Sequence, residues 1–322
     1  MLSIQGLQLE LISMYGLIYA VRNINLDVQK GTIHGIVGES GCGKSMTAKS
    51  ILRLHDEKKT EYRGQILYEG EDILKMTNRR LQTIRGKEIA MISQDPMTAL
   101  NPIKSIGKQI VEMILLHEKM AKQEAKKRAV ELLEKVGIQP GADRYNSYPF
   151  EMSGGQLQRV CIAMALACNP KLLIADEPTT ALDVTMQSQI LVLLKKLQRE
   201  RNSSILIITH NFGVVAEICD TVSVMYAGQI VETGNVHEIF NHPVHPYTQA
   251  LISCIPKAGE RSTRLTSIKG QPPQLNIDIV GCPYATRCQY ASEKCFMDTP
   301  VLHPVSEEHQ CMCFRSEEWR LK

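Results

Sequence analysis

The sequence contains no long apolar run. No stretch approaches the roughly 18 to 20 apolar residues that a helix needs to cross a bilayer. Residues Met1 to Glu10 also lack the charged start and the apolar stretch of a secretory signal peptide. We therefore expect any role at a membrane to depend on a partner protein.

There is also little excess charge of either sign. The formal net charge is +3, from 37 Lys and Arg against 34 Asp and Glu in 322 residues. Because proteins that bind nucleic acid usually carry a concentrated basic face, we expect no nucleic acid partner. Hydrophobic residues make up 43% and charged residues 22%, which is ordinary for a folded chain. The sequence has no internal repeats, and its length suits one main domain with an extension.

The first half of the sequence predicts strands followed by a loop and a helix. Two apolar stretches, Ile4 to Ile12 and Val21 to Val28, indicate antiparallel strands. Thr32 to Val37 is typical of a buried strand, and a glycine-rich turn separates it from a helix expected at Lys44 to Leu54.

The second half predicts a parallel sheet. Apolar strands are expected at Leu172 to Ala175 and Ile205 to Thr209, with a helix at Gln187 to Glu200 between them. Such alternation indicates an α/β fold with crossover helices. A helical subdomain is expected at about residues 95–158, most clearly at Gln109 to Val136. Prolines become frequent after residue 240, so we divide the chain into a main domain at 1–240 and an extension at 241–322.

One segment fits the P-loop pattern G-x-x-x-x-G-K-[ST] in the required context between a strand and a helix. Its backbone N–H groups would converge on a phosphate, Lys44 would reach the β- and γ-phosphates, and the Ser45 hydroxyl would bind Mg²⁺. A glycine-rich turn without ligand is the alternative. The residues expected at the nucleotide are Gly38, Ser40, Gly41, Cys42, Gly43, Lys44, Ser45 and Met46.

Two adjacent acids follow the strand that begins at Leu172. At the end of a buried strand, Asp176 can hold Mg²⁺ through water, while Glu177 can act as the general base for the attacking water. Alone, such a pair is weak evidence. Its position after a P-loop predicts an NTPase.

A second helix start able to bind an anion lies at Ser153, Gly154, Gly155 and Gln156. Together with Gln158 and Arg159, this segment resembles the signature sequence of the ABC ATPase family, with Met152 where leucine is usual. The resemblance implies a P-loop NTPase of RecA-like fold, with an antiparallel β part, a helical subdomain and, here, a Cys-rich extension.

Other positions resemble the family's functional stations in the same order. Tyr15 resembles the aromatic residue that stacks on adenine, Gln94 the Q-loop glutamine that reaches Mg²⁺, Asp183 the D-loop aspartate and His210 the switch histidine. Alternatives are an ordinary strand aromatic for Tyr15, a core histidine for His210 and a plain loop amide for Gln94. The resemblance implies catalytic roles for Lys44, Gln94, Glu177 and His210.

The family pairs two such domains head to tail, so each ATP lies between one subunit's P-loop and the other's signature motif. This pairing would explain two phosphate-binding helix starts in one chain. It implies a second ABC ATPase subunit as partner, which we expect to be a related but distinct chain.

Further segments resemble the oligopeptide and dipeptide importers within this family. They are Gln94 to Pro102, Ala181 to Thr185, His245 to Thr248, Gly281 to Cys288, Cys295, and His309 to Cys313. The resemblance implies an ATPase that powers peptide import across the bacterial cytoplasmic membrane. Alternatives are import of nickel or a metal complex, and, more remotely, a soluble ABC ATPase of DNA or translation machinery. An iron–sulfur redox enzyme would need a second cofactor site, which the sequence does not offer.

The implied partners are two transmembrane permease subunits and, indirectly, an extracellular substrate-binding protein. The implied location is peripheral, on the cytoplasmic face of the membrane. Closure of the ATPase pair around ATP would drive alternating access, and the helical region after Gln94 would contact the permeases.

Half of the ten cysteines lie between residues 282 and 313. Without a secretion signal, metal or redox chemistry is a better explanation than disulfides. Cys282, Cys288, Cys295 and Cys313 are separated by 5, 6 and 17 residues, unlike the C-x-x-C pairs of most zinc ribbons. Four thiolates suit Zn²⁺ or a [4Fe–4S] cluster, and thiols without metal are a third possibility.

The resemblance favours the iron–sulfur cluster. Because His309 aligns better with Cys313 as the fourth ligand, we leave Cys311 out. We expect a structural cluster that holds the extension together, well away from the ATP chemistry.

Overall fold

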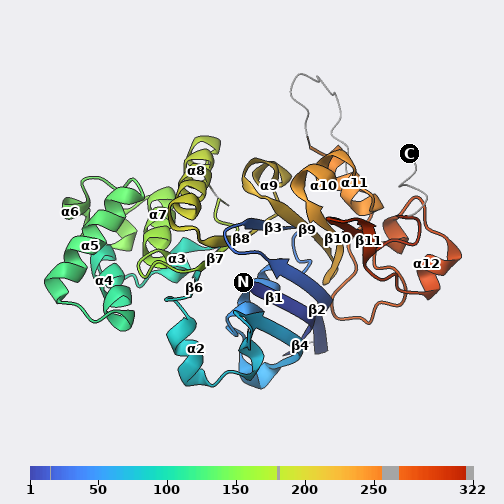
Figure 1. The fold of residues 1–322 in the computed structure, drawn as a ribbon, viewed down its shortest axis with the longest axis horizontal. Helices are drawn as coiled ribbons and strands as arrows, with labels where there is room; N and C mark the ends of the chain where they lie inside the picture. The colour runs from blue at the N-terminus through green and yellow to red at the C-terminus, as the bar shows by residue number, and fades with distance from the viewer. Residues whose placement is uncertain (15, 180–181, 256–267, 317–322) are drawn as a thin grey trace. The chain divides into compact units, whose positions relative to one another are not determined.

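The computed structural model describes residues 1–14, 16–179, 182–255 and 268–316. The chain divides into two compact units, and most of its helices and strands are labelled in Figure 1. The first unit comprises Met1–Gln29, Ile33–Lys75 and Thr209–Lys322, and the second comprises Lys30–Thr32 and Met76–Ile208. Both combine strands with helices, which confirms the α/β fold class.

An antiparallel sheet in the first unit has the strand order β2-β1-β4-β5. Its strands are β1 (Leu2–Ser13), β2 (Gly16–Val28), β4 (Thr60–Tyr68) and β5 (Glu71–Asp72). In β1 the residues Leu2, Ile4, Leu7 and Leu9 are all buried. One residue separates the buried positions elsewhere in this stretch, but two separate Ile4 from Leu7. At Gly6, between them, a φ of 58° and a shift in register mark a β-bulge. The two predicted N-terminal antiparallel strands are confirmed.

A second sheet in this unit has the strand order β11-β12-β10-β9-β3. Its strands are β3 (Ile33–Val37), β9 (Thr221–Tyr226), β10 (Gln229–Asn235), β11 (His303–Ser306) and β12 (His309–Cys311). β3 and β9 are parallel, whereas β9 and β10 form a hairpin. The hairpin turns at Ala227 and Gly228, both at positive φ, as a tight two-residue turn requires. β12 pairs with β10, so the C-terminal region extends this sheet (Figure 1).

Helices of the first unit connect these strands. They are α1 (Lys44–Ile51), α9 (Phe212–Ile218), α10 (Val236–Asn241), α11 (Pro246–Ser253) and α12 (Glu293–Met297), with 3₁₀ turns at Glu57–Lys59, Ile73–Lys75 and Ala285–Arg287. One apolar cluster includes Val224 and Tyr226 of β9, Tyr247 of α11, and Tyr284 and Met312 from the C-terminal region. The extension therefore shares a core with the sheet.

The second unit contains the parallel strands β6 (Ile89–Ile92), β7 (Leu172–Asp176) and β8 (Ser204–Thr209), in the order β8-β7-β6. β7 and β8 are buried along their whole length, as is usual for parallel strands covered on both faces. Both were predicted within one residue of their observed ends.

Helices make up the rest of the second unit. They are α2 (Asn78–Ile84), α3 (Pro96–Ala99), α4 (Ile106–His117), α5 (Lys122–Lys135), α6 (Gly141–Arg144), α7 (Gly154–Ala165) and α8 (Val184–Arg201), with a 3₁₀ turn at Pro149–Glu151. The clearest part of the predicted helical region consists of two helices, α4 and α5. Within the part of the chain that the structure describes, no helix has both the length and the hydropathy to span a bilayer.

Glu232 of β10 attaches the C-terminal region to the sheet. Its buried carboxylate accepts hydrogen bonds from the backbone N–H groups of Val244 (2.7 Å) and His245 (3.1 Å), and it lies 2.7 Å from Nε2 of His309 on β12. Burial lowers the pKa of His245 to about 4. The neutral ring then accepts a hydrogen bond at Nδ1 from the N–H of Tyr247. Three segments of the chain thus meet at one carboxylate.

We expect Glu232→Ala to lower the free energy of unfolding by roughly 3 kcal/mol or more, because each buried polar group left without its partner costs about 1 to 3 kcal/mol. Denaturant unfolding of the purified chain measures this change. Glu307→Ala removes the same charge from an exposed position and should change stability by no more than about 0.5 kcal/mol. Equal stabilities of the two variants would contradict the anchoring role.

Candidate functional site

The glycine-rich loop lies between β3 and α1 and packs tightly against the rest of its unit. A Cβ atom on Gly38 would lie 2.1 Å from the carbonyl oxygen of Met225. Gly43 adopts a φ of 106°, and a Cβ there would lie 2.4 Å from the carbonyl oxygen of Ala20. Both positions therefore require glycine. The loop leads into α1, whose first backbone N–H groups can receive an anion.

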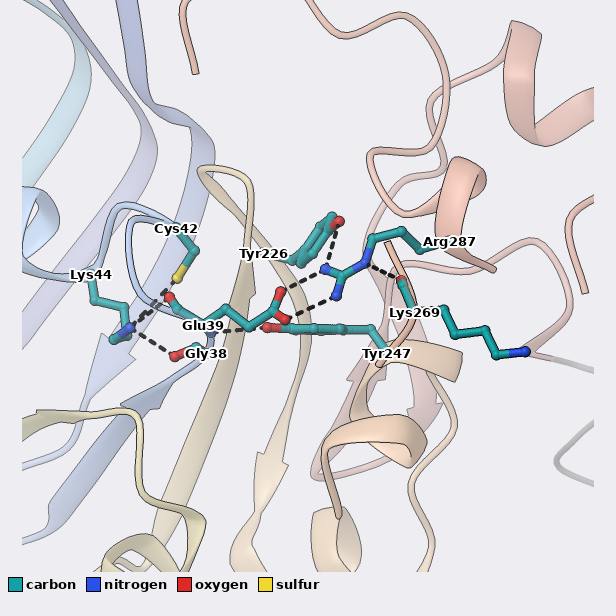
Figure 2. A network of polar contacts seen from close by, with 8 residues as sticks. All are labelled: Gly38, Glu39, Cys42, Lys44, Tyr226, Tyr247, Lys269 and Arg287. Carbon is teal, nitrogen blue, oxygen red and sulfur yellow. Dashed lines mark hydrogen bonds and ion pairs between the residues drawn. The ribbon is translucent and has the colours of Figure 1, made fainter. Parts of the chain in front are cut away.

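Lys44, the first residue of α1, is 4% exposed. Its Nζ donates hydrogen bonds to the carbonyl oxygens of Gly38 (2.8 Å) and Glu39 (2.9 Å), as Figure 2 shows. It also lies 3.8 Å from Sγ of Cys42, whose pKa burial raises. The ammonium group is thus held inside the loop, next to the N–H groups of the helix start. This arrangement suits an anionic ligand.

The remaining predicted loop residues are more accessible. Ser40 and Gly41 are exposed, whereas Ser45 and Met46 are half-buried in the first turn of α1. The structure thus brings the predicted phosphate-binding residues together in one loop and helix start.

A carboxylate site lies at the end of β7 in the second unit. Asp176 is its last residue and is 2% exposed. Glu177 follows with a φ of 48°, and its N–H donates to the carbonyl oxygen of Ile208 (2.8 Å). Nε2 of Gln94 donates to Oε2 of Glu177 (3.1 Å). Gln94 therefore meets the acidic pair at this strand end, although it lies 83 positions from Glu177 in the sequence.

The predicted second anion-binding helix start is the N-terminus of α7. Ser153 is the N-cap, and its hydroxyl accepts from the N–H of Gln156 while the Gln156 side chain accepts from the N–H of Ser153 (3.0 Å). This capping box fixes the start of the helix. Ser153 and Gly154 are exposed, and a Cβ on Gly154 would meet no atom within 4 Å. The N-terminus of α7 is therefore accessible to a ligand.

Two other predicted site residues mark helix boundaries. Asp183 is the N-cap of α8, and its carboxylate accepts from the N–H of Met186 (2.8 Å). His210 follows β8 directly and is exposed. Tyr15 and Ala181 lie outside the described residues.

The four cysteines chosen as ligands line one small cavity of about 20 Å³. These are Cys282, Cys288, Cys295 and Cys313. Burial raises the pKa of the Cys282 thiol to about 12, and the neighbouring thiols act in the same direction. Within residues 1–14, 16–179, 182–255 and 268–316, no group of three or more His, Cys, Asp or Glu side chains is arranged as a metal site. The cavity thus gathers four thiols, which are not arranged as a metal site.

Cys311 lies elsewhere. It is fully buried in a separate apolar cluster with Val244 and Val305, and it does not line the cavity of the other four. Cys313 packs against this cluster, so it neighbours Cys311, although only Cys313 of the two lines the cavity.

One group of residues near the glycine-rich loop was missed from the sequence. Arg287 of the extension forms an ion pair with Glu39, and the Tyr247 hydroxyl accepts a hydrogen bond from the N–H of Glu39. We expected the cysteine cluster of the extension to lie well away from the ATP chemistry, and the sequence analysis did not anticipate that Arg287 of the same extension contacts the glycine-rich loop. Both Tyr247 and Arg287 belong to segments that we had quoted as family-like, but nothing in the local sequence indicates their partner.

Comparison with known families gives two matches. Residues 21–180 match the ABC transporter family, and residues 231–295 match the C-terminal region of oligopeptide/dipeptide transporters. The first match contains the glycine-rich loop, Gln94 and the acidic pair. The second contains Tyr247, Arg287 and three of the four cysteines that line the cavity.

Individual relatives agree with these matches. An oligopeptide transport ATP-binding protein of Bacillus subtilis is 50% identical, with 96% of this chain and 87% of that protein covered. A dipeptide transport ATP-binding protein of the same species is 44% identical, with 98% and 95% covered. Among solved structures, a dimeric ATP-binding cassette bound to ADP and phosphate has a TM-score of 0.66 at 28% identity, with 73% of this chain and 99% of that chain covered.

These relatives cover nearly the whole chain, and the family matches contain the glycine-rich loop, the acidic strand end and the cysteine segment. The chain therefore belongs to the ATP-binding subunits of ABC transporters, in the oligopeptide and dipeptide branch.

Proposed function

We propose that this ATPase powers the import of dipeptides and oligopeptides across the bacterial cytoplasmic membrane. The match of residues 231–295 to the C-terminal region of oligopeptide/dipeptide transporters carries this proposal, because the ATPase core is common to all ABC proteins. The chain would act as a peripheral protein on the cytoplasmic face with two permease subunits. An extracellular binding protein would deliver the peptide.

We propose the domain division that the sequence analysis gave. Residues 1–240 form the ATPase domain, with the helical subdomain at about 95–158, and residues 241–322 form the extension. The exposed N-terminal segments of the helical subdomain include Met97 and Ile103, large apolar side chains that are 62% and 82% exposed. They support the contact with permeases that we expect after Gln94.

In the proposed phosphate site, Lys44 exchanges its hydrogen bonds to loop carbonyls for hydrogen bonds to the phosphates. The N–H groups of Gly41, Gly43 and the first turn of α1 surround the same charge. Ser45, Gln94 and Asp176 are the proposed protein groups for Mg²⁺, which neutralises phosphate charge when bound. Hydroxyl, amide and carboxylate oxygens are the hard donors that this ion prefers.

Glu177 is the proposed general base. Its left-handed backbone conformation is uncommon for a non-glycine residue, and the hydrogen bond from its N–H to Ile208 holds it there. Nε2 of Gln94 donates to one oxygen of the Glu177 carboxylate, and a carboxylate at this strand end can accept a proton from the attacking water. His210 is the proposed contact to the γ-phosphate, and Tyr15 to adenine.

Glu177→Gln should bind MgATP with near-normal affinity but hydrolyse it about 10² to 10⁴ times more slowly, because the amide cannot accept the proton. Single-turnover hydrolysis and ATP titration separate the two effects. Glu124→Gln removes an exposed carboxylate from α5 and should leave both values unchanged. A turnover within about threefold of the wild type would refute the assignment of the base.

The α7 helix start is the proposed binding site for the ATP held by a second ATPase subunit. Its accessible N-terminus and the serine N-cap support this role. Asp183 would lie at the same interface, as the D-loop does in the family.

We expect Ser153→Arg to leave the ATP dissociation constant of the isolated chain unchanged but to abolish its turnover, because the added side chain blocks only the partner's nucleotide. Turnover of the wild-type chain should rise with protein concentration, and it should rise further with the related partner subunit and the permeases. Concentration-independent turnover by a monomer in gel filtration would contradict this prediction.

The cysteine cavity is the proposed site of a structural [4Fe–4S] cluster, with Zn²⁺ as the alternative. Four thiols are the donor set that either group takes. Either would lower the raised pKa values of Cys282, Cys288 and Cys313 through its positive charge. Cys282, Cys288, Cys295 and Cys313 would hold the group.

Anaerobic purification followed by iron, sulfide and zinc analysis tests this proposal. About four irons with acid-labile sulfide per chain are expected, and one zinc per chain would shift the assignment to Zn²⁺. Cys313→Ser should lose the metal, whereas Cys311→Ser should retain it because Cys311 is buried in a different cluster. A chain without metal after anaerobic purification would remove the proposal.

A further inference from the structure

The extension and the glycine-rich loop meet at a two-point ion pair. Nη1 of Arg287 lies 2.6 Å from Oε2 of Glu39, and Nη2 lies 3.0 Å from Oε1. This is the bidentate geometry in which arginine binds carboxylates most strongly. The Arg287 side chain is 3% exposed and that of Glu39 is 27% exposed, so water screens the pair only in part.

Further contacts fix the orientation of Arg287. Nε donates to the carbonyl oxygen of Lys269 (3.0 Å), and Nη1 also lies 3.2 Å from the hydroxyl of Tyr226. The guanidinium carbon lies 5.7 Å from the centre of the Tyr226 ring and 5.9 Å from that of Tyr284. These contacts hold the guanidinium in place to receive one carboxylate.

Glu39 is held through its backbone as well. Its N–H donates to the hydroxyl of Tyr247 (3.0 Å), which is fully buried and packs against Tyr226 with ring centres 4.6 Å apart. The Glu39 carbonyl oxygen accepts from Nζ of Lys44 (2.9 Å). Figure 2 shows Glu39 between Lys44 on one side and Arg287 on the other. A displacement of Glu39 would therefore change the loop backbone that holds Lys44 before phosphate binds.

The charges of Arg287 and Glu39 should affect phosphate binding in addition to the positions of the two residues. Without Arg287, the Glu39 carboxylate would place an unneutralised negative charge in a loop that receives phosphates. Repulsion between such a carboxylate and a bound phosphate would weaken anion binding.

From these contacts we propose that Arg287 is a positioning residue for ATP binding, so that the C-terminal extension forms part of the phosphate site of its own chain. Arg287 holds Glu39 in place and neutralises its carboxylate. It does not contact the reacting atoms. The proposal rests on the glycine-rich loop being the phosphate site, as proposed above.

ATP titration of the full-length chain at fixed Mg²⁺ tests the proposal. Arg287→Ala should raise the ATP dissociation constant by about tenfold or more, the order expected from the loss of a bidentate charged pair. The rate at saturating ATP should change little, because Gln94 and Glu177 remain intact. Arg63→Ala removes an arginine from an exposed ion pair with Glu61 and should leave ATP binding unchanged.

A second variant separates charge neutralisation by Arg287 from simple loss of structure. Glu39→Gln in the Arg287→Ala background should restore most of the lost affinity, because it removes the uncompensated charge. A defect in the fold of the extension would not be repaired by a change in the loop. Arg287→Lys should bind ATP with intermediate affinity, because lysine keeps the charge but loses the bidentate geometry.

Two results would overturn the proposal. One is wild-type ATP affinity in Arg287→Ala, and the other is a double variant that binds ATP as weakly as Arg287→Ala alone. Lys44→Ala distinguishes this failure from failure of the phosphate site itself. If Lys44→Ala binds ATP normally, the loop is not the phosphate site, whereas weak binding by Lys44→Ala with normal binding by Arg287→Ala refutes only the role of Arg287.

Discussion

The contact of the glycine-rich loop with the β9–β10 hairpin is the constraint on which the first unit depends. Gly38 allows the loop backbone to pass against the carbonyl group of Met225, where any side chain would collide. The hairpin turn also contacts the loop, because the N–H of Gly228 donates a hydrogen bond to the carbonyl oxygen of Cys42 (2.8 Å). Gly228 in turn accepts from the N–H of Arg22 in β2. The loop is thus fixed by backbone contacts that leave its exposed side open to an anion.

The same hairpin supports the C-terminal extension. β10 presents Glu232 to the segment that begins α11 and pairs along its edge with β12. β9 contributes Tyr226, which packs against Tyr247 and Tyr284 and approaches Arg287. A single hairpin therefore contacts the phosphate loop on one side and organises the extension on the other. The extension is consequently part of the core of this unit and not an appended tail.

Much of the local structure could be predicted from the sequence. The P-loop pattern, the buried strands at Leu172 and Ile205 and the helix after Lys44 all depend on residues within a few positions of one another. The capping box at α7 is also local, since Ser153 and Gln156 have the spacing that such a box requires. Each of these features depends on a short stretch of sequence, and the structure contains the loop, the strands and the helices at the predicted residues.

Features that join distant segments could not be predicted in the same way. Arg287 and Glu39 are 248 positions apart, and neither residue's neighbours indicate the other. Gln94 and Glu177 are 83 positions apart and could be associated only through resemblance to a family. Cys311 is buried at the end of β12 in an apolar cluster against which Cys313 packs, and the local sequence does not indicate which of the two lines the cavity. These contacts between distant residues depend on how whole segments pack together, and the local sequence around each residue does not indicate that packing.

Electrostatics gives a reason why a phosphate loop can contain a glutamate at all. A carboxylate in this loop opposes the anion that the loop receives, whereas a small neutral residue would not. In this chain the Glu39 carboxylate is paired with the buried guanidinium of Arg287. The hydrogen bond between the two side chains is the largest factor that raises the pKa of Arg287. The pair converts a repulsive charge into an attachment point between the loop and the extension. In our proposal the phosphate site therefore depends on a segment outside residues 21–180, the part that matches the ABC transporter family, so the extension does not act as an independent module.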